Sequence, residues 1–88
     1  MNTIDKLVNL DMYMNFKEAM NLVERLNPKD FNLNDKGAFN KLRTIHTNIL
    51  KAYMMINFTA PTKFELKDEC KKAGMKVADL LNSFSKFN

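Results

Sequence analysis

The stretch YMMINFTAPTKFEL, residues 53–66, decides the fold, because it is compatible with two different backbone conformations. In the first, residues 53–59 form a short strand that ends before Pro61. In the second, residues 35–58 form one continuous helix and the chain is an all-α three-helix bundle. Short apolar runs of this kind cannot be assigned by periodicity alone. The segments on either side of this stretch therefore bear on the choice between the two conformations.

The strand alternative depends on the alternation of apolar and polar residues. One parity is apolar throughout: Met54, Ile56 and Phe58. The other parity becomes polar toward its end: Met55, Asn57 and Thr59. A period of two is that of a half-buried strand, and Ile, Phe and Thr favour strands. Pro61 cannot donate a hydrogen bond within a sheet, but it suits the first turn of a following helix.

The segments on both sides of this stretch are helical in pattern. Apolar residues recur at three- and four-residue steps over residues 3–26, which predicts a helix with a break near Asp11. A loop follows at residues 27–35, and Asp35 is a good N-cap for a second helix. Residues 1–52 are therefore expected to form a helical hairpin. After residue 61 the helical period returns, and Gly74 is expected at a helix end in the left-handed C′ position.

The main prediction is thus one mainly α domain over residues 1–88: a helical hairpin, a strand at 53–59, and a helix-turn-helix pair. The order strand, proline, helix, glycine, helix resembles the ribbon-helix-helix family of Arc- and MetJ-like repressors. The residues that carry the resemblance are INFTAPTKFELKDECKKAGMKVADLLNSF, and GMKVADLL matches best. An alternative interpretation of ELKDECKKAGMKVADLL is a helix-turn-helix motif.

The resemblance implies that two protomers pair their strands into a ribbon that enters the DNA major groove. Met55, Asn57 and Thr59 would then face the bases, while Met54, Ile56 and Phe58 would lie in the dimer core. The backbone amides near Lys76 and Val77 would hold a phosphate. A basic stripe with four-residue spacing would add salt-dependent phosphate contacts: Lys63, Lys67 and Lys71.

Catalysis, cofactors and metals are not expected. The formal net charge of +4 favours polyanionic partners only mildly. His46 is the only histidine and Cys70 the only cysteine, too few for a typical zinc site. A single thiol suits a reducing cytoplasm. No apolar run reaches the roughly 18 residues expected of a membrane span.

The function expected from these features is that of a small, dimeric, cytoplasmic DNA-binding transcriptional regulator. The abundance of Asn, Lys and Met suggests an AT-rich genome, such as that of a Firmicute, a plasmid or a phage, and a phage- or plasmid-type regulator is the expectation. The alternative belongs to another class, a helical adaptor or inhibitor that binds a protein and no nucleic acid. Methionine makes adaptable binding surfaces, so the first helix is a possible partner surface through three residues: Met12, Met14 and Met20.

Overall fold

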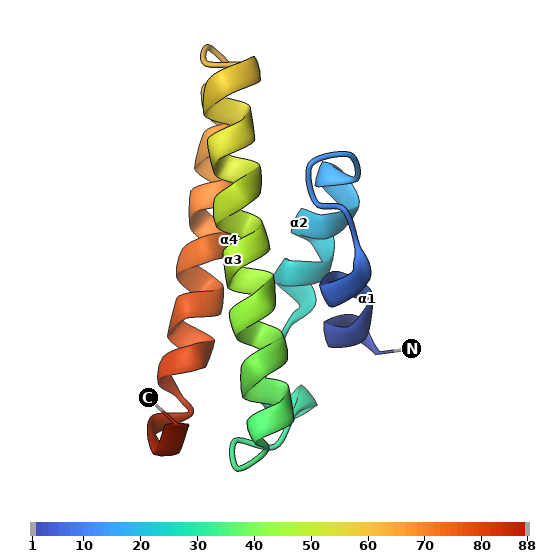
Figure 1. Cartoon of the computed structure of the whole chain (residues 1–88), viewed down its shortest axis with the longest axis vertical. Helices are drawn as coiled ribbons and strands as arrows, with labels where there is room; N and C mark the ends of the chain where they lie inside the picture. The colour runs from blue at the N-terminus through green and yellow to red at the C-terminus, as the bar shows by residue number, and fades with distance from the viewer. Residues whose placement is uncertain (1, 88) are drawn as a thin grey trace.

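The computed structural model describes residues 2–87, which form four α-helices and two 3-10 helices. These are α1 (Thr3–Asn9), α2 (Phe16–Arg25), η1 (Pro28–Asp30), α3 (Lys36–Thr59), α4 (Phe64–Asn82) and η2 (Ser85–Phe87). Helices α3 and α4 form a long antiparallel hairpin, and the shorter α1 and α2 lie along one side of it (Figure 1). The molecule is elongated, with extents of 40 × 25 × 16 Å.

The strand predicted for residues 53–59 is wrong, because α3 continues without interruption through Thr59. The last bond of its ladder runs from the Ala60 amide to the Ile56 carbonyl at 2.8 Å. The buried positions of α3 keep a helical period up to this end: Ala38, Phe39, Leu42, Ile45, Ile49, Ala52 and Ile56. A helix also satisfies its backbone groups locally, whereas a lone strand would leave its amides unpaired.

The alternative prediction, one helix over residues 35–58, is therefore confirmed. The bundle has four helices rather than three, because the first predicted helix is divided near Asp11. The Asp11 carboxylate accepts hydrogen bonds from the amides of Tyr13 at 3.1 Å and Met14 at 3.0 Å, which shapes the turn between α1 and α2. The predicted break at this aspartate is confirmed.

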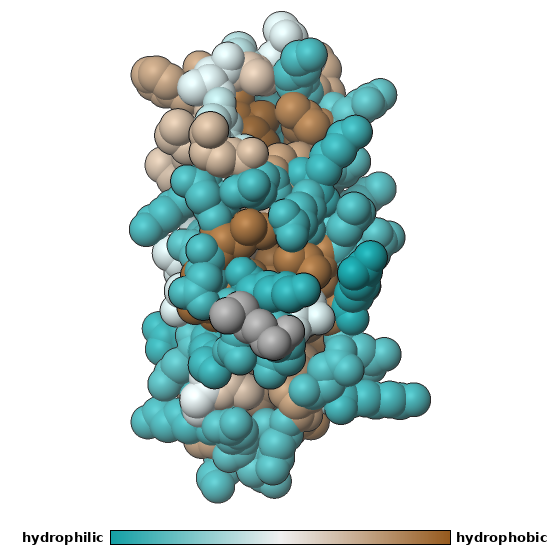
Figure 2. All heavy atoms as spheres, turned by 90° about the vertical axis from the view of Figure 1, so that its right-hand side faces the viewer, coloured by the Kyte–Doolittle hydropathy of each residue, from teal (hydrophilic) through white to brown (hydrophobic). Residues whose placement is uncertain are grey.

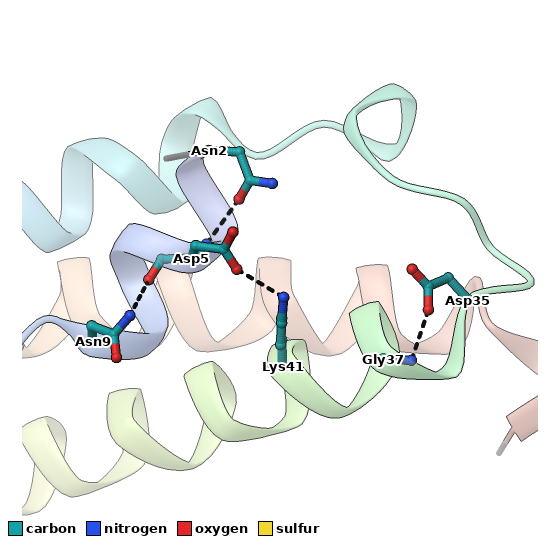
Figure 3. A network of polar contacts seen from close by, with 6 residues as sticks. All are labelled: Asn2, Asp5, Asn9, Asp35, Gly37 and Lys41. Carbon is teal, nitrogen blue, oxygen red and sulfur yellow. Dashed lines mark hydrogen bonds and ion pairs between the residues drawn. The ribbon is translucent and has the colours of Figure 1, made fainter.

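Side-chain caps fix the starts of α1 and α3 (Figure 3). Asn2 accepts from the Asp5 amide at 2.9 Å, and Asp35 accepts from the Gly37 amide at 2.8 Å. Each bond satisfies a donor that has no partner within its own helix. The prediction that Asp35 caps the second helix of the hairpin is confirmed.

A salt bridge ties α1 to α3 on the surface: Lys41 Nζ lies 2.8 Å from Asp5 Oδ1 (Figure 3). The hydrogen bond to Asp5, and the negative charge of that carboxylate, raise the pKa of Lys41. The pair is exposed to solvent, which screens the attraction, so it orients α1 more than it stabilises the fold.

The core runs the length of the hairpin and is closed at one end by aromatic rings. Phe84 is completely buried. Its ring stacks on Phe31 with centroids 5.4 Å apart and lies 5.5 Å from the ring of Phe39. These contacts join the end of α4, the loop after α2 and the start of α3. Among residues 2–87 no buried side-chain nitrogen or oxygen lacks a hydrogen-bond partner.

The sequence pattern predicted Gly74 at a helix end, and this prediction is wrong. Gly74 lies in the interior of α4. The predicted pair of helices over residues 62–87 is consequently one helix followed by a 3-10 turn. Gly74 has no positive φ angle. It is buried against α3, where an added Cβ would lie 3.6 Å from Ile49 Cγ2. Gly74 is therefore part of a packed helix interior rather than a chain reversal, and the distance to Ile49 leaves room for a methyl group.

Replacing Gly74 by alanine is expected to raise the free energy of unfolding by about 0.5–1 kcal/mol, because glycine in a helix interior costs roughly this amount. The new methyl group would make an ordinary van der Waals contact with Ile49. Urea denaturation followed by circular dichroism measures the change. A destabilised variant would contradict this helix, since alanine is unfavourable where a chain reverses with positive φ.

Candidate interaction surface

The three residues predicted to face DNA bases lie on the last turns of α3 and do not form one row. Residues two apart on a helix point about 200° away from each other, so Asn57 is directed away from Met55 and Thr59. The Thr59 hydroxyl is also occupied, because it donates to the Met55 carbonyl at 2.7 Å. The arrangement that a strand would have given these three side chains is absent.

The four predicted phosphate-binding lysines are distributed along α4. Lys63 precedes the helix and, like Lys71, is exposed. Lys67 donates to the Pro61 carbonyl at 3.1 Å, and its ammonium lies 4.9 Å from the centre of the Phe64 ring. Lys76 donates to the Glu24 carbonyl of α2. Two of the four lysines thus make contacts within the protein, and Lys76 stands in the interior of α4 rather than at a helix start.

The most unusual surface of the molecule follows from unequal helix lengths. Helix α3 has 24 residues and α4 has 19, whereas α1 has 7 and α2 has 10. At 1.5 Å per residue, α3 is about 36 Å long, and α1 and α2 are about 10 and 15 Å long. The last turns of α3 and the start of α4 extend beyond α1 and α2 (Figure 1). There α3 has fewer neighbours than in the core.

Four large apolar side chains project into solvent at this end, and we call them the hairpin tip: Met54, Met55, Phe58 and Phe64. Their exposed fractions are 68%, 45%, 88% and 65%. Met54, Met55 and Phe58 share one side of α3, since they are separated by one, three and four positions. Phe64 follows on the other side of the turn at residues 60–63. Contiguous apolar exposure of this kind marks an interaction site more often than chance.

The connection between α1 and α2 supports the tip from one side. The Tyr13 hydroxyl lies 2.7 Å from Thr59 Oγ1. Because Thr59 donates its own proton to the Met55 carbonyl, Tyr13 is the donor of this bond. Met14, next in the chain, is 76% exposed. Seen from the side of α1 and α2, hydrophobic residues appear both at the upper end of the molecule, which carries the tip, and across its middle (Figure 2).

Met54 and Phe58, the central residues of this surface, were expected in a dimer core, and that prediction is wrong, because both are exposed. The available signal was that YMMINF, residues 53–58, is apolar on every side of a helix. Only one face of the helix is buried at this end. Ile56 lies on that face and is 3% exposed, so the apolar side chains on the other faces remain in solvent. For the predicted Met-rich surface of the first helix, Met12 is buried, Met20 is partly buried and Met14 is exposed.

Apart from the hairpin tip, the surface has a groove between α2 and α4. Its walls carry three lysines, Lys17, Lys72 and Lys76, and two carboxylates, Glu24 and Glu69. The charges of opposite sign nearly balance. This groove therefore shows no preference for an anionic or a cationic ligand.

Cys70 and His46 do not form a nucleophile and base pair. The Cys70 thiol is 1% exposed and donates to the Ile49 carbonyl at 3.3 Å, so its hydrogen bond is not to His46. Burial raises the pKa of Cys70 to about 11. Within residues 2–87 there is no group of three or more His, Cys, Asp or Glu side chains that could hold a metal ion.

The Cys70 thiol is expected to resist modification by a disulfide reagent at pH 8 until the protein unfolds, because it is buried and protonated. Thiol titration with and without urea measures this reactivity, and rapid modification of the native protein would contradict this burial.

The pKa of Cys70 in the fold, about 11, is above the ordinary value of 9.0. The stabilising effect of this shift is complete below about pH 9 and is lost as the pH rises toward 11, which denaturation at several alkaline pH values measures.

Comparison of the chain with protein-family models, curated proteins and solved structures finds no match. Among residues 2–87 no helix combines the length and the apolar character needed to cross a bilayer.

Proposed function

We propose that this protein is a small helical interaction module, an adaptor or inhibitor that binds another protein through the hairpin tip. The observation that supports this proposal most is Phe58, an aromatic side chain that is 88% exposed beside two exposed methionines. Aromatic residues and methionine are enriched where proteins bind each other. Methionine also adapts its shape to a partner.

The tip combines an adaptable surface with a rigid support. Met54 and Phe58 project from the same helix that carries the core residues Ile45, Ile49 and Ile56. Side chains on a packed helix are presented with little loss of backbone freedom on binding, which favours affinity. The DNA-reading ribbon expected from the sequence has no counterpart here, because its strand is helical. Protein binding is therefore the function that the geometry favours.

Selection from a displayed library of random 16-residue peptides tests this proposal. The wild-type protein is expected to enrich peptides that fail to bind a double variant, Met54→Gln with Phe58→Gln. Glutamine suits a helix surface, so the double variant is expected to keep the circular dichroism spectrum of the wild type. If no peptide is enriched, or if every enriched peptide binds both proteins equally, the hairpin tip is not a protein-binding site.

A further inference from the structure

The net charge of the protein is concentrated on one helix. Helix α3 contains four cations and no Asp or Glu: Lys36, Lys41, Arg43 and Lys51. Of the 14 basic and 10 acidic residues of the chain, this leaves 14 − 4 = 10 basic against 10 acidic residues elsewhere. The formal charge of +4 is therefore that of α3 alone.

Two of these cations lie on the outer side of α3 without an acidic partner. Within residues 2–87 the only ion pair is that of Lys41 with Asp5. Arg43 and Lys51 are exposed and border a shallow depression whose other walls are uncharged: Asn40, Thr44, Thr47 and Asn48. The Arg43 guanidinium lies 6.0 Å from the Phe39 ring centre, which holds it against the helix surface. This depression contains donors for an anion and no carboxylate.

The cationic side chains and the hairpin tip lie on the same ridge of α3. Arg43, Thr47, Lys51, Met54 and Phe58 follow one another at steps of four, four, three and four residues, which is one face of a helix. Phe58 is about 10 Å along the axis from Lys51 and about 22 Å from Arg43. We call this face the α3 ridge. Its first half is cationic and polar, and its second half is apolar.

We infer that the occupant of the α3 ridge is an acidic protein segment with an apolar anchor at one end. This inference rests on the proposed function and names the partner by its chemistry. The anchor packs on Met54 and Phe58, while carboxylates about 10–22 Å away along the segment pair with Lys51 and Arg43. Arginine binds carboxylates with particular geometric specificity because of its planar fork. Charge complementarity of this kind sets specificity and the association rate.

The charges of α3 favour such a segment over a second copy of this chain. In a symmetric dimer each protomer uses the same surface. Two α3 ridges would then place Lys51 opposite Lys51, and in a parallel arrangement also Arg43 opposite Arg43, with no carboxylate of α3 to separate them. Juxtaposed like charges cost binding energy. A partner that supplies carboxylates removes this repulsion.

The number of cations also favours an acidic peptide over nucleic acid. DNA-binding proteins commonly neutralise about 6–10 phosphates, whereas the α3 ridge offers only Arg43 and Lys51. An exposed phenylalanine and methionine on the same ridge match an apolar anchor better than a phosphate backbone. Duplex DNA is therefore included in the test as the competing ligand.

The experiment uses the selected peptides and a charge-reversed variant, Arg43→Glu with Lys51→Glu. Peptides that require Met54 and Phe58 are expected to be rich in Asp and Glu, and charge reversal is expected to weaken their binding about five- to thirty-fold. The matched control is Lys29→Glu with Lys86→Glu. It makes the same change in net charge at exposed positions outside α3 and is expected to leave affinity unchanged.

The remaining outcomes separate this inference from the proposed function. Tip-dependent peptides without acidic residues, or unaffected by the reversal at Arg43 and Lys51, overturn the inference and leave the tip as a binding site. The absence of any tip-dependent peptide overturns both. The wild-type protein is also tested with a generic 20-base-pair duplex. If it binds the duplex, and if charge reversal abolishes this binding while the tip variant retains it, the ridge is a nucleic-acid site and the inference is overturned. A dimer in sedimentation that the tip variant dissociates assigns the ridge to a second copy and also overturns it.

Discussion

Replacing Phe84 by alanine is expected to lower the free energy of unfolding by about 3–5 kcal/mol, the usual cost of removing a large aromatic ring from a core. Phe84 has no exposed surface, and it holds the rings of Phe31 and Phe39. For a domain of this size each kcal/mol corresponds to a fall in Tm of about 4–8 °C. Urea and thermal denaturation followed by circular dichroism measure both quantities.

Phe58→Ala is the matched control for this experiment, because it removes the same ring from a position that is 88% exposed. Its effect on stability is expected to stay within about 0.5 kcal/mol, as for most surface substitutions. Equal destabilisation by the two substitutions would show that the end of α3 is covered and that Phe58 is part of a core. Phe84→Leu, which keeps much of the buried volume, is expected to fall between them.

The same Phe58→Ala variant is expected to show the largest loss of binding. An aromatic anchor in the centre of an interface commonly contributes 2 kcal/mol or more. The Kd for selected peptides should therefore rise at least about thirty-fold. Isothermal titration calorimetry with one selected peptide measures this change.

Met75→Ala provides the comparison for binding. Met75 is 67% exposed on α4, next to Gly74, which packs beside Ile49 and hence well before the end of α3. Its replacement is expected to change affinity less than about threefold, because truncating most residues outside a hot spot costs under 1 kcal/mol. A similar loss from both substitutions would place the contact on the whole hairpin rather than at its tip.

The features of the fold that were predictable from the sequence are those with a local physical cause. Asp11 and Asp35 organise their own backbone amides, so a turn and a helix start were evident at these positions. The residues before Asn27 and after Asp35 show the helical period directly. The contacts between helices, such as Phe31 on Phe84, join residues far apart in the chain, and no local pattern reveals them.

The two errors in the fold have different origins. Residues 53–58 are apolar at so many positions that periods of 2 and 3.6 both fit, and the length of the preceding helix decides between them. Gly74 was assigned to a helix end from its conformational freedom. In the structure it has an ordinary helical backbone and room for a methyl group beside Ile49. A single sequence does not separate a glycine that ends a helix from one that lies inside it.

The candidate site was less predictable than the fold. Met54, Met55 and Phe58 could be identified as apolar, but whether they are buried depends on the lengths of α1 and α2, which leave the end of α3 uncovered. The absence of acidic residues from α3 was visible in the sequence. Its consequence depends on the helix, which carries Arg43 and Lys51 on the same side as Phe58.

At the projecting end of the hairpin, the side chains needed for stability and those available for binding lie on opposite sides of one helix. Ile45, Ile49 and Ile56 are buried in the core, whereas Met54 and Phe58 are mostly exposed to solvent. Substitutions on the outer side can therefore adapt the protein to a different target while the core, and with it the fold, is retained. Exchanging only these projecting side chains should redirect what the protein captures, and the hairpin would remain folded throughout.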